Sequence, residues 1–77
     1  MNIQEFLDGL VVAIDLPDLQ NLSPSIPFAD ITDFDSLATL GVMTFVEIEF
    51  NTQIHGQWLW DEKITPQQLY DHLTKGG

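Results

Sequence analysis

The sequence predicts an all-α protein: a small four-helix bundle with three main helices, one short helix and a long ordered first loop. Residues 2–14 and 36–50 carry the apolar spacing of α-helices, and the segment that begins at Thr65 has the capping residues of a helix start. Sustained alternation of apolar and polar residues, which would indicate strands, is scarce. The 77 residues suit one domain, which we take to span residues 1–77.

The first helix is expected over residues 2 to about 14. Its apolar residues follow the i, i+3, i+4, i+7 spacing of an amphipathic helix: Ile3, Phe6, Leu7, Leu10, Val11 and Ile14. Gly9 is a mild defect in this helix.

Residues 15–34 read as a long loop with turns and one short helical turn, because they contain Pro17, Pro24 and Pro27 among several polar residues. The loop is too apolar for a free linker. We expect six residues to pin it over the core: Leu16, Leu19, Leu22, Ile26, Phe28 and Ile31.

The second helix is expected over residues 36–50, with Asp35 as its N-cap. At 100° per residue its core face comprises Thr39, Val42, Met43, Val46 and Phe50. Leu37, Gly41, Thr44 and Ile48 then point the opposite way, with Leu40 and Phe45 on the flanks. Core packing does not explain this second uncharged stripe, so it predicts an exposed binding face.

The remaining chain is expected to form a short helical turn within QWLWDE and a final helix. We expect at least one of Trp58 and Trp60 to lie in the core. Thr65 is the predicted N-cap of the last helix, Pro66 its first residue, and Gln68 completes a capping box. The sequence KGG marks its end.

Charge and composition narrow the possible functions. Twelve acidic residues face two basic ones, Lys63 and Lys75, so nucleic acid and anionic membranes are not expected as partners, whereas proteins with basic patches are. The N-terminal segment lacks a basic region, and Glu5 and Asp8 interrupt its apolar run, so we expect neither a signal peptide nor a membrane span. A cytoplasmic monomer is the expectation.

No metal site is expected. The chain has no cysteine, and His55 and His72 lack paired ligand spacing. The acidic stretch DITDFD lacks the length and the glycine of a calcium loop.

Ser36 stands where the second helix begins. The N–H groups and partial positive charge of a helix N-terminus favour an attached phosphate. No histidine follows Ser36 at triad-like spacing and no glycine elbow surrounds it, so catalysis by this serine is not expected. Taken alone, an Asp-Ser pair is more often only a helix cap.

The segment DFDSLATLGVMTFVEIEFNTQI nevertheless resembles the phosphopantetheine-attachment segment of acyl carrier proteins. The resemblance includes Asp35-Ser36-Leu37, the apolar helix after it, Glu47 with Glu49-Phe50, and the closing Ile54. The long preceding loop, the late ITPQQLYDHL helix and the total length extend it over essentially the whole chain.

This resemblance implies four helices, the third of them short, and a non-catalytic carrier. A phosphopantetheinyl transferase would move 4'-phosphopantetheine from coenzyme A onto Ser36, with a magnesium ion on the transferase side. The arm's thiol would hold an acyl, aminoacyl or polyketide group for acyl- or aminoacyl-loading and condensing or transferring enzymes. Those partners would dock on Asp35, Leu37, Leu40, Gly41, Thr44, Glu47 and Ile48.

Some positions depart from the family pattern. Many carriers have a glycine where this chain has Asp33, and peptidyl carriers often have two. Ala38, Gly41 and Ile48 stand where fatty-acid carriers commonly have charges, and His55 replaces the usual proline after the closing isoleucine. These departures favour a specialised stand-alone carrier of secondary metabolism that docks through more hydrophobic contact.

Two alternatives remain open at this point. An unmodified acidic helical adaptor would use Ser36 only as a cap. Ubiquitin-like and sulfur-carrier proteins also end in Gly-Gly, as Gly76-Gly77 does here, but their folds are mostly β.

Overall fold

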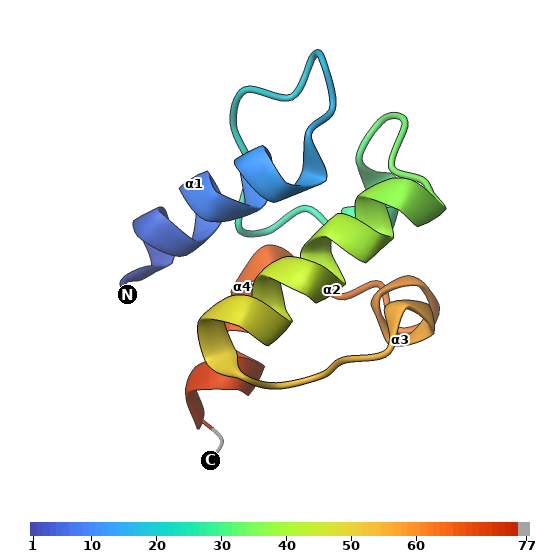
Figure 1. Cartoon of the computed structure of the whole chain (residues 1–77). Helices are drawn as coiled ribbons and strands as arrows, with labels where there is room; N and C mark the ends of the chain where they lie inside the picture. The colour runs from blue at the N-terminus through green and yellow to red at the C-terminus, as the bar shows by residue number, and fades with distance from the viewer. Residues whose placement is uncertain (76–77) are drawn as a thin grey trace.

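This computed structural model describes residues 1–75, which contain four α-helices and one 3₁₀ turn joined by loops (Figure 1). They are α1 (Ile3–Ile14), η1 (Phe28–Asp30), α2 (Ser36–Phe50), the short α3 (Gly56–Asp61) and α4 (Pro66–Lys75). Residues 1–75 contain no strand, which confirms the all-α prediction and removes the fold that a ubiquitin-like carrier requires. In the same range, no helix combines the length and the apolar character needed to cross a membrane.

Side-chain caps fix where the helices begin. Asn2 caps α1 rather than belonging to it: its Oδ1 accepts a hydrogen bond from Glu5 N (2.9 Å), while Asn2 N donates to Glu5 Oε1 (3.0 Å). The predicted capping box of α4 is confirmed, with Gln68 N donating to Thr65 Oγ1 and Thr65 N donating to Gln68 Oε1. α4 extends to Lys75, the first residue of the KGG sequence that was expected to mark its end. Gly76 and Gly77 lie outside the described residues.

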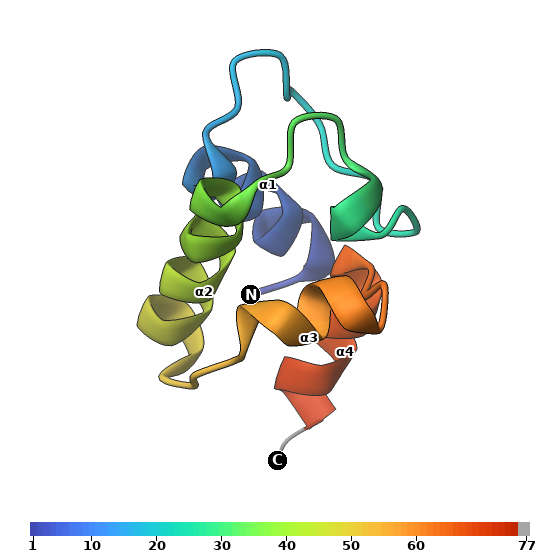
Figure 2. The same cartoon turned by 90° about the vertical axis from the view of Figure 1, so that its right-hand side faces the viewer.

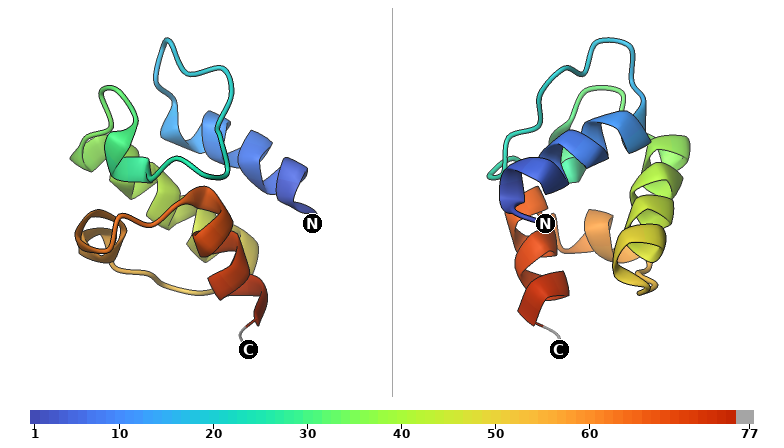
Figure 3. Two further views of the ribbon diagram at one scale, coloured as in Figure 1. Left: turned by 180° about the vertical axis from the view of Figure 1, so that it is seen from behind. Right: turned by 60° about the vertical axis from the view of Figure 1, so that its left-hand side comes forward.

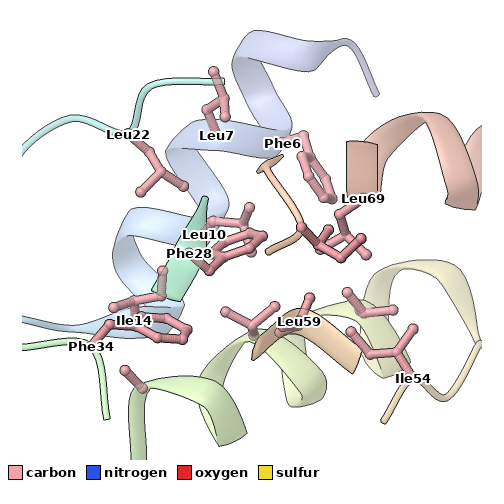
Figure 4. Close-up of a cluster of buried hydrophobic side chains, with 14 residues drawn as sticks. Phe6, Leu7, Leu10, Ile14, Leu22, Phe28, Phe34, Ile54, Leu59 and Leu69 are labelled. Carbon is pink, nitrogen blue, oxygen red and sulfur yellow. The ribbon is translucent and has the colours of Figure 1, made fainter. Parts of the chain in front are cut away.

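The core lies between the helices and contains side chains from all four of them (Figure 4). Phe6 of α1 is fully buried, and its ring contacts those of Phe45, Phe50 and Tyr70 at centroid distances of 5.7, 5.8 and 5.1 Å. Tyr70 also donates a hydrogen bond from its hydroxyl to the Met1 carbonyl (2.7 Å), which joins α4 to the start of the chain. Burial of aromatic area at this centre is a major stabilising contribution in so small a protein.

The first loop is ordered because it is both packed and hydrogen-bonded. Leu22 and Phe28 are buried, and Leu16, Leu19 and Ile31 are partly buried against the core, as predicted. The prediction is wrong for Ile26, which is 50% exposed. Two backbone hydrogen bonds of 3.0 Å tie the loop to the region where α4 begins: Phe28 N donates to Ile64 O, just before the helix, and Gln67 N, in its first turn, donates to Pro24 O. The loop therefore lies over one end of the bundle (Figure 3).

The short α3 bridges the space between α2 and α4 (Figure 2). Trp58 packs against the core but stays partly exposed, and its ring lies 4.9 Å from that of His72 on α4. Trp60 is 37% exposed. The expectation that one tryptophan lies in the core is therefore met only in part, by Trp58.

The core face of α2 is partly as predicted. Thr39, Val42 and Val46 are buried, whereas Met43 and Phe50 are only partly buried. Ala38, which sequence reasoning assigned to a position where charges are common, is also buried. α2 packs on α1 along one side and on α3 along another, so its buried face is wider than a single stripe.

Candidate functional site

Ser36 is the first residue of α2, and its side chain is exposed. The cap of the helix is its neighbour: Asp35 Oδ1 accepts a hydrogen bond of 2.9 Å from Ala38 N, as predicted. Asp35 is also exposed. The Ser36 hydroxyl therefore stands at a helix N-terminus without serving as its cap.

Aromatic packing before Ser36 and hydrogen bonds after it fix the backbone on both sides of this residue. Phe34 is buried, with its ring 5.7 Å from that of Phe28 and 5.5 Å from that of Trp60. Thr39 Oγ1 donates to Asp35 O (2.8 Å) and accepts from Trp60 Nε1 (3.0 Å). An exposed serine thus projects from a rigid helix start.

A tight turn leads into this helix start. Phe34 N donates to Ile31 O at 3.1 Å, and Asp33 within the turn has a φ of 67°. Glycine adopts this left-handed conformation without steric cost, and aspartate tolerates it better than most residues. Asp33 is one of the positions at which the sequence departs from the pattern that it otherwise resembles.

Most of the predicted docking residues line one groove between α1 and α2. This α1/α2 groove has a volume of about 740 Å³. Its lining consists of Gly9, Val12, Ala13, Ile14, Asp15, Leu37, Leu40, Gly41, Thr44, Phe45, Ile48 and Glu49. Leu37 and Ile48 are 74% and 72% exposed, so α2 presents large apolar side chains to solvent, as its second stripe predicted.

Three predicted docking residues differ from the others. Asp35 caps α2 and does not line the groove. Gly41 is partly buried where α2 crosses α1, and a Cβ there would collide with the carbonyl oxygen of Ala13. It provides the close approach of the helices and adds backbone, not a side chain, to the groove. Glu47 is exposed but does not line the groove, and its carboxylate accepts a long hydrogen bond of 3.5 Å from Gln53 Nε2.

Sequence reasoning missed the contribution of α1. Val12 is 77% exposed and lines the groove opposite the α2 stripe. A signal was present, because Val11 and Val12 are adjacent on a helix and only one of them can face the core. Val11 is the one that packs against the core.

Acidic groups dominate the electrostatics of the groove. Asp15 and Glu49 line it, and neither Lys63 nor Lys75 does. Lys63 Nζ instead lies 3.7 Å from Asp30 Oδ1, in an exposed ion pair that contributes little to stability. Within residues 1–75, no cluster of three or more His, Cys, Asp or Glu side chains is arranged to hold a metal ion.

No family model, curated protein or solved structure matches this chain.

Proposed function

We propose that the chain is a specialised carrier protein, modified with 4'-phosphopantetheine on Ser36. It would pass thioester-bound acyl, aminoacyl or polyketide intermediates between partner enzymes, in a biosynthetic pathway of secondary metabolism. The observation that carries this proposal is the exposed Ser36 hydroxyl at the first position of α2, capped by Asp35 and followed by the exposed Leu37.

The residues present fit such a group. The first amides of a helix have no partner within it, and Asp35 occupies only that of Ala38. The amides of Ser36 and Leu37 and the helix dipole would favour a phosphodiester on the serine. The left-handed Asp33 also supports the resemblance, since its φ suits the glycine common in carriers.

The modification is a phosphoryl-group transfer. The Ser36 oxygen would attack the phosphorus atom that bears the pantetheine arm in coenzyme A, and the pyrophosphate bond would break. Adenosine 3',5'-bisphosphate would leave, and the hydroxyl proton would pass to a base of the transferase. Once attached, the arm supplies a thiol for thioester formation, while this chain positions the arm and offers the apolar surface beside it.

Intact-mass spectrometry tests the proposal. The full chain is incubated with coenzyme A, magnesium and a broad-specificity phosphopantetheinyl transferase. We expect a gain of one phosphopantetheine, lost in Ser36→Ala and retained in the matched control Ser25→Ala, which alters an exposed loop serine. No gain with any transferase would overturn the proposal.

The apolar α1/α2 groove favours a second candidate, an adaptor that binds a partner without a prosthetic group. The two candidates differ in the mass experiment, because an adaptor gains nothing. If the protein is a carrier, replacing Leu40 or Ile48 with glutamate should lower transfer by its partner enzymes without blocking phosphopantetheine attachment.

A further inference from the structure

The α1/α2 groove has the form of a channel between two antiparallel helices. Gly9 of α1 lies against Phe45 of α2, while Ala13 lies against Gly41, so the helices run in opposite directions. The groove follows α2 from Leu37 to Glu49. At 1.5 Å per residue, this is about 18 Å, or just over three helical turns.

This shape suits a third helix. Two neighbouring helices form a furrow into which the ridge of another helix packs, and amphipathic helices are commonly bound in such grooves. Val12 forms one wall, and Leu40 and Ile48 form the other, with spacings that an apolar helical stripe can match.

Charge specifies the chemistry of the occupant. Asp15 lies near the Leu37 end of the groove, because it is two residues beyond Ala13, which contacts Gly41, and Glu49 lies at the other end. Both are exposed. Carboxylates at both ends of an apolar channel complement a helix whose apolar stripe is flanked by lysine or arginine.

A second copy of the chain fits poorly. Each copy has a net charge of −10, and the groove presents two carboxylates and no lysine to whatever approaches it. A symmetric pairing through this face would bring like charges together.

We propose that the α1/α2 groove binds a basic amphipathic helix of a partner protein, with apolar side chains against Val12, Leu40 and Ile48. Its basic side chains would lie against Asp15 and Glu49. The bound helix would have one end beside Ser36. The biological purpose of this binding rests on the proposed carrier function. The binding itself does not require the modification.

The test uses the full unmodified chain, isotopically labelled for NMR, and a synthetic helical peptide of leucine and lysine with one leucine stripe. We expect saturable binding, with chemical-shift changes centred on Val12, Leu37, Leu40 and Ile48. A scrambled peptide of the same composition and a leucine–glutamate peptide should bind at least tenfold more weakly. Equal binding of the scrambled peptide, or shift changes centred on α3 and α4, would overturn the proposal.

Matched variants locate the contact. Val12→Gln and Ile48→Gln should each weaken binding roughly tenfold through lost apolar burial. Ile26→Gln, at an exposed apolar residue outside the groove, should leave the affinity unchanged within about twofold. Glu49→Gln should weaken binding of the peptide and make the affinity less dependent on salt concentration. Glu62→Gln, outside the groove, should have smaller effects on both. If Val12→Gln binds as tightly as Ile26→Gln, the groove is not the site.

Two further outcomes identify a different occupant and would also overturn the proposal. One is concentration-dependent dimerisation in sedimentation equilibrium that Val12→Gln abolishes, which assigns the groove to a second copy. The other is the same groove shifts in acyl-phosphopantetheine-loaded protein without peptide, which assigns it to the tethered group. Peptide binding by Ser36→Ala separates this inference from the carrier proposal, because each can fail while the other holds.

Discussion

Trp60 Nε1 donates a hydrogen bond to Thr39 Oγ1 at 3.0 Å, and this bond connects α3 to the first turns of α2. The Thr39 hydroxyl in turn donates a hydrogen bond to the carbonyl of Asp35, the residue that caps α2. The position of Ser36 thus depends on a residue of the short third helix. We therefore expect a displacement of α3 to change the position of Ser36.

Thr39→Val removes both hydrogen bonds while keeping the side-chain volume. We expect a loss of about 1 kcal/mol in the free energy of unfolding, measured with urea, and a change in tryptophan fluorescence as Trp60 loses its partner. Thr44→Val is the matched control, because the exposed Thr44 hydroxyl bonds only to Leu40 O. Equal losses for the two variants would show that the Trp60 bond contributes nothing.

Ser36→Ala should leave stability within about 0.5 kcal/mol of the parent protein, because Ser36 does not cap α2. Asp35→Ala should cost about 1 kcal/mol, and Asp35→Asn should recover most of that loss, since asparagine is an equally good cap. Urea unfolding of the three variants measures these differences. A loss in Ser36→Ala as large as that in Asp35→Ala would reverse the assignment of the cap.

Gly41→Ala should destabilise the protein by about 1–3 kcal/mol, since the added methyl group meets the Ala13 carbonyl of α1. The backbone oxygen cannot rotate away as a side chain can. Thr44→Ala, on the exposed part of the same helix, should be neutral or slightly stabilising because alanine favours helix. Thermal unfolding compares the two. Stabilisation by Gly41→Ala would mean that helix propensity outweighs the contact.

Asp33→Gly should preserve or raise stability, by up to about 1 kcal/mol, because glycine adopts the left-handed φ of this turn without strain. Asp33→Ala should lower it by about 1 kcal/mol, since alanine has neither that freedom nor a side chain that hydrogen-bonds locally. Denaturant midpoints measure both changes. A lower midpoint for Asp33→Gly than for Asp33→Ala would show that the aspartate side chain, not the backbone, is what the turn needs.

Local sequence signals predicted the helices well. The apolar spacing located α1 and α2, and Thr65 with Gln68 located the start of α4, because periodicity and capping act over only a few residues. Asp35 as the cap beside Ser36 followed from the same short-range rules.

Features that depend on how the helices pack could not be predicted in this way. The Trp60–Thr39 bond joins residues 21 positions apart. The contribution of Val12 to the groove, and the placement of Gly41 at the crossing, require the relative rotation of α1 and α2, which a single helix does not encode. Ile26 shows the opposite limit, since an apolar residue in a turn-rich loop was assumed to be covered and is half exposed.

The hydrogen bond from the Tyr70 hydroxyl to the Met1 carbonyl has a practical consequence for joining this chain to others. It fixes the first residue beside α4, at the end of α1 that is distant from the start of α2 (Figure 1). An affinity tag, a fluorescent protein or a surface linker fused ahead of Met1 would therefore extend from the far end of the bundle. Both Ser36 and its neighbour Leu37 should remain accessible when the protein is immobilised this way.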